Sequence, residues 1–354
     1  MTGTGDGLRT TPVPSYPVAV SVTERPVAVP APPARIPRRI RPHPVEVLTV
    51  LLVVAVLARG WLVGWTAGAR TQTWLTIFVS IVVQASPFVV LGTVLSAVIA
   101  VLVPPSFFAR ALPNRPALAV PVAGAAGAIL PGCECGSVPI AGALVRRGVT
   151  PAAALAFLLS APAINPVVLV ATSVAFPGRP QMVVARLLAS LVTSVVMGWL
   201  WLRLGRADWL RMPARPDLAG LSRSAAFLAA CRHDMTQAGG YLVVGAVTAA
   251  TMNVVVPPRW LHLVAAHQVL SVLALAALAV VLSICSEADA FVAASLTQFS
   301  LTARLAFLVV GPMVDFKLFA MQAGAFGRRF AVRFAPATFV VGVVCAAVVG
   351  AVLL

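Results

Sequence analysis

Residues 130–139 read Leu130-Pro131-Gly132-Cys133-Glu134-Cys135-Gly136-Ser137-Val138-Pro139, a polar stretch between the apolar segments 117–129 and 140–145. Prolines at both edges and two glycines between them disfavour a continuous helix. The sequence therefore predicts two thiols and a carboxylate on irregular backbone at membrane depth. Such backbone is stable there only when it is buried in protein or lines a wet cavity, because hydrocarbon satisfies no free N–H or C=O group. An ionisable residue in that position predicts a functional site.

The composition of the 354-residue chain identifies the class of protein. Hydrophobic residues make up 60% of the chain and charged residues 10%, which excludes a soluble domain and predicts a polytopic membrane protein. The formal net charge of +16 is carried almost wholly by arginines in loops between apolar segments. The positive-inside rule accounts for them better than nucleic-acid binding does. Five cysteines, an odd number in mostly apolar surroundings, argue against a disulfide framework.

Apolar runs and arginine clusters divide the chain into six parts of an all-α protein. The expected parts are a disordered, basic, proline-rich cytoplasmic tail (1–44), a first transmembrane span (45–66), a first transporter repeat (74–203), a basic cytoplasmic linker (204–236), a second transporter repeat (237–325) and a last transmembrane span (335–354). No apolar run of the signal-peptide type precedes Glu46. The arginines of the tail and of the linker predict a multi-pass protein of the inner or plasma membrane with a cytoplasmic N-terminus.

The two halves of the chain repeat each other in sequence. The matching strings, in order, are 91–94 with 244–247, 103–105 with 256–258, 133–144 with 285–296, 155–158 with 305–308, and Pro162 and Asn165 with Pro312 and Asp315. A re-entrant hairpin that returns Arg147 to the cytoplasm leaves an odd number of crossings between equivalent elements, and the halves are then inverted. The sequence therefore predicts an inverted repeat with two broken helical hairpins, which is typical of secondary transporters with a midplane site. Hairpins that span the membrane fully are the open alternative.

Cysteines and an amide are the candidate substrate ligands. Cys133 and Cys135 suit a soft, thiophilic solute or metal ion, because Cys-x-Cys places two sulfurs close together. The alternative is that both are small residues that let a helix end pack closely. Cys285 is the equivalent residue of the second half and would complete a three-sulfur site only if the two breaks meet. Asn165 either binds substrate or caps broken backbone. These four residues and Glu134 form the predicted substrate site.

Four acids are expected at membrane depth: Glu134, Glu287, Asp289 and Asp315. A carboxyl group whose access to water alternates can take up a proton in one state and release it in the other. Glu287, Asp289, Asp315 and Lys317 are therefore the predicted ion- or proton-coupling residues. The alternative is structural pairing, because an unpaired buried charge is costly, and Lys317 is the only lysine available to neutralise an acid.

These motifs also resemble a known family. Segments 131–139, 147–148 and 160–166 of the first half, and 285–291 and 311–317 of the second, resemble the YraQ/ArsP-type predicted permeases (the UPF0718 group). The similarity covers roughly residues 75–325. The resemblance implies a permease and, because some members export trivalent organoarsenicals, a thiophilic metalloid or organoarsenical substrate. Glu134 departs from the small or polar residue that usually separates the two cysteines in the family, which would make the thiol site anionic.

Two functions from different classes follow. The favoured prediction is a secondary transporter, not an enzyme, that uses an ion or proton gradient to export a small solute through the cysteine and acid site. The alternative is a membrane-embedded thiol redox or accessory protein, although Cys-x-Cys is not the Cys-x-x-Cys of thiol oxidoreductases. No Walker motif is present, so direct coupling to ATP is not expected. No cofactor is expected, and the expected partners are the lipid bilayer and a small solute or ion, without nucleic acid; a homo-oligomer is left open.

Overall fold

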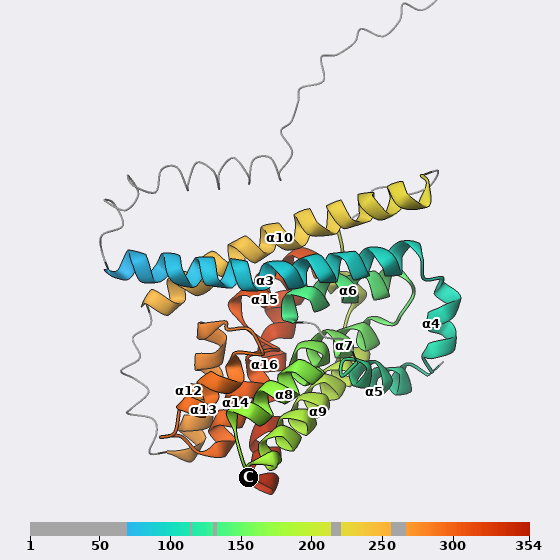
Figure 1. Ribbon diagram of the computed structural model, residues 1–354. Helices are drawn as coiled ribbons and strands as arrows, with labels where there is room; N and C mark the ends of the chain where they lie inside the picture. The colour runs from blue at the N-terminus through green and yellow to red at the C-terminus, as the bar shows by residue number, and fades with distance from the viewer. Residues whose placement is uncertain (1–68, 114, 130–132, 214–220, 256–266) are drawn as a thin grey trace, which may run out of the picture. The chain divides into compact units, whose positions relative to one another are not determined.

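The computed structural model describes residues 69–113, 115–129, 133–213, 221–255 and 267–354, which form helices joined by short turns (Figure 1). The first half contains α3 (Ala69–Val101), α4 (Pro105–Ala111), α5 (Pro116–Ala126), α6 (Glu134–Arg146), α7 (Pro151–Ile164), α8 (Pro166–Ala175), α9 (Pro180–Leu204) and the 3-10 helix η1 (Ala207–Trp209). The second half contains α10 (Arg223–Val255), α12 (Gln268–Leu282), α13 (Asp289–Ser295), α14 (Leu301–Val310), α15 (Phe316–Phe326) and α16 (Arg328–Leu353). The predicted tail and first span lie outside the described residues.

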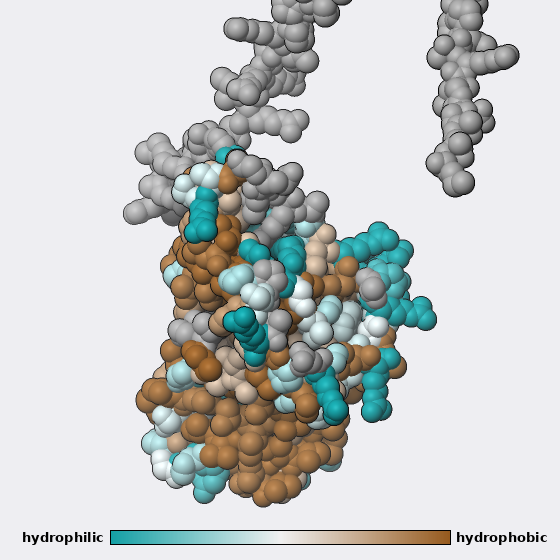
Figure 2. All heavy atoms as spheres, turned by 90° about the vertical axis from the view of Figure 1, so that its right-hand side faces the viewer, coloured by the Kyte–Doolittle hydropathy of each residue, from teal (hydrophilic) through white to brown (hydrophobic). Residues whose placement is uncertain are grey.

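Five described segments are long and apolar enough to cross a membrane: 70–101, 151–175, 180–204, 223–255 and 328–353. Exposed aliphatic side chains recur every four residues on the outer helices, as at Val184, Leu188 and Val192 of α9. Figure 2 shows the result, a broad hydrophobic surface on one face of the molecule. Surfaces of this kind are rare on soluble monomers and fit contact with lipid. The predicted all-α polytopic membrane class is confirmed.

Prolines and polar caps set the helix boundaries. Five helices of the first half, α4, α5, α7, α8 and α9, begin with a proline, whose missing N–H costs nothing at that position. Pro166 also holds Asn165 in an extended conformation, with ψ of 158°, and so ends α7. α10 begins at Arg223, so its first turns lie in the basic segment that the sequence assigned to a linker.

The order of helices repeats between the two halves. α3, α5, α6, α7, α8 and α9 correspond to α10, α12, α13, α14, α15 and α16. α7 and α14 lie at the centre, and both copies of the sequence Leu-Ala-Phe-Leu, at 155–158 and 305–308, are buried. The longest helices, α3 and α10, pack on each other and run in opposite directions (Figure 1). Inversion of the repeat across a membrane stays a prediction.

Two equivalent glycines let α3 and α10 approach the breaks of the hairpins. A methyl group on Gly92 of α3 would lie 2.5 Å from the Cα of Gly136 in α6. A methyl group on Gly245 of α10 would overlap the Cα of Lys317 in α15. The repeated Gly92 and Gly245 are therefore explained by the same requirement, that helix backbones touch where a side chain would not fit.

We expect Gly245→Ala to destabilise the protein, because the added methyl group must displace the backbone at Lys317. Overpacking of this kind costs about 1–3 kcal/mol. Gly240→Ala is the matched control on the same helix, since a methyl group there meets no atom within 4 Å. It should be neutral or stabilise α10 by up to about 1 kcal/mol. Thermal unfolding of the detergent-solubilised variants measures both, and equal melting temperatures would contradict the close approach.

Candidate functional site

A fully buried lysine joins the two broken hairpins. The Nζ of Lys317 lies 2.6 Å from Oε1 of Glu134 and 3.4 Å from Oδ2 of Asp315. It donates a hydrogen bond of 3.0 Å to the carbonyl oxygen of Ser283 and lies 3.9 Å from the sulfur of Cys285. Glu134 begins α6 in the first half, whereas the other four residues belong to the second half. The structure therefore brings the first break and both breaks of the second half together at one ammonium group.

The backbone around Glu134 differs from the prediction. The sequence placed Glu134 and Cys135 on irregular backbone, but α6 begins at Glu134 and only Cys133 precedes it in an extended conformation. The N–H groups of a first helical turn need no partner within the helix, so a glycine-rich stretch can start one. Gly136 and Ser137 donate to the carbonyl oxygen of Cys133 and close this turn. The helix start also favours the negative charge of Glu134.

Asn165 and Asp315 perform the same task at equivalent breaks. Oδ1 of Asn165 accepts a hydrogen bond of 3.0 Å from the N–H of Val168, the third residue of α8. Oδ1 of Asp315 accepts one of 2.5 Å from the N–H of Leu318, the third residue of α15. The amide nitrogen of Asn165 donates to the carbonyl oxygen of Ala161. The geometry thus favours helix capping over substrate contact for Asn165, while the second oxygen of Asp315 faces Lys317.

Three cysteines surround the buried ion pair. Cys133 and Cys135 flank Glu134 and are fully buried. Cys285 contacts Lys317 from the second half. The side chains in the described parts of the chain contain no group of three or more His, Cys, Asp or Glu arranged to hold a metal ion. In this conformation the three thiols line a charged site and do not form a three-sulfur metal centre.

A second buried charge, Arg186 of α9, was not anticipated from the sequence. Its guanidinium donates two hydrogen bonds, one of 2.9 Å to the hydroxyl of Thr172 in α8 and one of 3.2 Å to the carbonyl oxygen of Ser286. Asp289 and Glu287 are its acidic neighbours, so two of the predicted coupling acids lie near Arg186. The signal in the sequence is an arginine inside the apolar segment 180–204 rather than at its end.

Several buried polar atoms of both clusters have no hydrogen-bond partner among the described residues. They include Oε2 of Glu134 in the lysine cluster, and Nε of Arg186, Oγ of Ser286 and Oδ2 of Asp289 in the arginine cluster. Such groups are expensive when buried without a partner. When both acids are ionised, the lysine cluster carries one positive and two negative charges, a net charge of minus one. That excess suits the binding of a proton or a cation.

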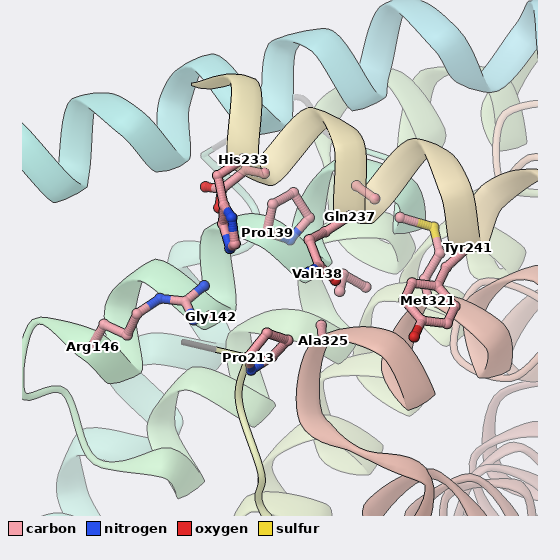
Figure 3. Close-up of a pocket in the computed structure, with 12 residues that line it drawn as sticks. Val138, Pro139, Gly142, Arg146, Pro213, His233, Gln237, Tyr241, Met321 and Ala325 are labelled. Carbon is pink, nitrogen blue, oxygen red and sulfur yellow. The ribbon is translucent and has the colours of Figure 1, made fainter. Parts of the chain in front are cut away.

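A small cavity lies one helical turn from the ion pair. Its volume is about 40 Å³, which has room for a few water molecules. On α6 it is lined by Val138 and on α15 by Met321, each four residues after a partner of the Glu134–Lys317 pair. Figure 3 shows Arg146 and His233 at one end of the cavity and Tyr241 with Met321 at the other. The cavity therefore lies near the buried pair, but neither Glu134 nor Lys317 lines it.

Comparisons with known proteins agree on one family. A family described as predicted permeases matches residues 70–351. The UPF0718 protein YcgR of Bacillus subtilis (strain 168) is 37% identical over 278 residues, which cover 77% of this chain and 94% of that protein. A Streptococcus mutans protein, named as a subunit of a two-component membrane permease complex, is 34% identical over 284 residues, 78% of this chain and 94% of its own length. No solved structure matches the chain.

The ion-pair geometry predicts an order of stabilities. Lys317→Met should be the most destabilising single change, by about 3–5 kcal/mol, because it leaves two buried carboxylates without a counter-charge. Glu134→Gln and Asp315→Asn should each cost less, since Lys317 keeps the other acid as a partner. Expression level and thermal unfolding in detergent measure this order. Equal losses for all three variants would show that Lys317 does not serve both acids.

Proposed function

Because the chain belongs to this family of predicted permeases, we propose that it is a secondary transporter that exports a small solute through the site at Lys317. The proposal starts from the family match, which supports a multi-pass membrane permease. The finer assignment is supported by one observation: a buried ammonium group binds an acid from the first half and an acid, a carbonyl and a thiol from the second. Paired broken helices that converge on one place are typical of transporter binding sites.

Charge balance supports coupling to a proton or a cation. Lys317 neutralises only one of its two acids, and the second oxygen of Glu134 has no hydrogen-bond partner in the described residues. A proton or a cation on this carboxylate would remove the excess negative charge when the site closes. When the site opens to water, solvation would stabilise the ionised form again. Glu134 and Asp315 are therefore the acids that the geometry supports most directly as coupling groups, with Glu287 and Asp289 beside them in the second cluster.

The thiols support a soft solute. Cys133 and Cys135 lie beside Glu134, and Cys285 contacts the lysine that Glu134 binds. A thiophilic species such as a trivalent metalloid compound could therefore meet sulfur from both halves of the chain. The redox alternative is disfavoured by burial, because neither Cys133 nor Cys135 is accessible to a redox partner.

A second protein component is a further part of the proposal. The name of the Streptococcus mutans relative describes a subunit of a two-component membrane permease complex. We extend that arrangement to this chain, whose lipid-facing helices offer apolar surface to another membrane protein (Figure 2). Co-purification with a tagged copy of this chain from native membranes, followed by mass spectrometry, would identify such a component.

Replacing the paired thiols tests the substrate class. A host sensitive to trivalent arsenicals should gain resistance from the wild-type chain and lose it with Cys133→Ser combined with Cys135→Ser. The reason is that serine keeps the size of cysteine but does not bind soft ions. Cys345→Ser, a buried cysteine on α16, is the matched control and should retain resistance. Resistance that survives the double change would remove the thiol role, and no resistance from the wild type would reject arsenicals as substrates.

Replacing a carboxyl by an amide tests coupling. In reconstituted vesicles Glu134→Gln should reduce transport driven by a pH gradient to background while solute exchange at equal pH continues, because the amide carries no charge and takes up no proton. Glu287→Gln is expected to behave in the same way if the second cluster also couples. Asp208→Asn, an exposed acid in η1, is the control and should leave both rates unchanged. Normal gradient-driven transport by both Glu134→Gln and Glu287→Gln would reject carboxyl coupling.

A further inference from the structure

Ten of the twelve paired helices pack with the symmetry of the repeat. α5 packs on α7 as α12 packs on α14, and α7 packs on α9 as α14 packs on α16. α6 packs on α7 as α13 packs on α14. α6 also packs on α15, and the equivalent helices α13 and α8 pack on each other. These helices, α5 to α9 and α12 to α16, are called the core here.

The remaining pair, α3 and α10, breaks this symmetry. α3 packs on α6 and α10 packs on α15. The repeat would equally place α10 on α13 and α3 on α8, but among the described helices neither contact is formed to a comparable extent. Figure 1 shows the same arrangement, with α3 and α10 lying across α6 and α15 and away from α8 and α13. The pair therefore covers only one of two equivalent faces of the core.

Because α3 and α10 cover only one of the two faces, equivalent residues of the two halves differ in exposure. Val167 and Val174 of α8 are 50% and 62% exposed, whereas Lys317 and Gly324, at the same positions of α15, are buried. Phe291 of α13 is 52% exposed, and its counterpart in α6 is a buried proline. The uncovered face of α8 and α13 is thus a copy of the face on which α3 and α10 now lie.

We propose that α3 and α10 form one rigid body that alternates between these two faces as the core moves past it. The role of this movement in transport rests on the proposed function. The movement itself is inferred from helix packing and does not depend on any solute. In the observed state the pair covers the lysine cluster, with Gly92 on Gly136 and Gly245 on Lys317. In the alternate state α3 lies on α8 and α10 lies on α13, beside the cluster of Arg186 and Asp289. The pair therefore covers the lysine cluster in one state and the arginine cluster in the other.

The repeat specifies contacts of the alternate state. Tyr241 of α10 and Ala325 of α15 line the same cavity in the observed state. Their equivalents are Phe88 of α3, four residues before its glycine, and Ala175 of α8, ten residues after its capping residue. A disulfide between Tyr241→Cys and Ala325→Cys should therefore report the observed state. A disulfide between Phe88→Cys and Ala175→Cys should report the alternate one.

Gly324→Val should shift the population from the observed state toward the alternate state, even without a solute. The ring of Tyr241 lies against the bare backbone of Gly324, so a side chain there disfavours the observed packing. The equivalent position of α8 already carries valine. Gly324→Val should raise the fraction of the Phe88–Ala175 disulfide about tenfold in detergent or vesicles, as expected for overpacking of this size. Gly239→Val, where a methyl group meets no atom within 4 Å, is the matched control and should leave the fraction unchanged.

A protease site is placed in a loop between the two introduced cysteines, so that after cleavage the fragments stay joined only where the disulfide has formed. Variants with one introduced cysteine measure the disulfides that form with native thiols. An unchanged Phe88–Ala175 fraction in folded Gly324→Val protein would overturn the proposal. If Gly324→Val does not fold, Gly324→Ala replaces it, since a methyl group already meets the Tyr241 ring. A shift in the disulfides from a protein that transports none of the tested solutes would support the movement and reject the proposed function instead.

Discussion

An ammonium group without access to water constrains the rest of this structure. Lys317 cannot be buried without counter-charges, and it obtains them from Glu134 in the first half and Asp315 in the second. Each acid must therefore be held at a fixed place. The start of α6 fixes Glu134, and the capping bond to Leu318 fixes Asp315. Both acids lie at breaks of the hairpins, directly at or before the first residue of a helix.

The two clusters place opposite charges on opposite halves of the chain. In one, an acid of α6 meets the lysine of α15; in the other, an arginine of α9 lies near acids of the second half. Each half therefore supplies an acid to one cluster and a cation to the other. Both clusters therefore join the two halves within the core, and none of their charged residues lies on α3 or α10.

The sequence predicted the helical membrane class, the repeat and the residues of the lysine cluster, because each leaves a local pattern. Hydrophobic runs mark spans, and a polar break in such a run is conspicuous, as at Cys133 and Asp315. The ion pairs of Lys317 could not be predicted, because they depend on how helices distant in the sequence pack on each other. The start of α6 was missed because helix N-termini tolerate glycine. Arg186 was missed because a single arginine does not interrupt the hydrophobic run 180–204, and its partners come from other segments of the chain.

The central helices are also short, with consequences for biosynthesis. α14 has 10 residues and α7 has 14, so at 1.5 Å per residue they extend only about 15 and 21 Å, less than the roughly 30 Å of hydrocarbon. α7 continues into α8, and together they form the segment 151–175, which is long enough to cross. α14 alone is too short to be a stable span and has to insert together with the helices beside it in the chain. The centre of the bundle therefore depends for its insertion on helices of the second half, which are translated last.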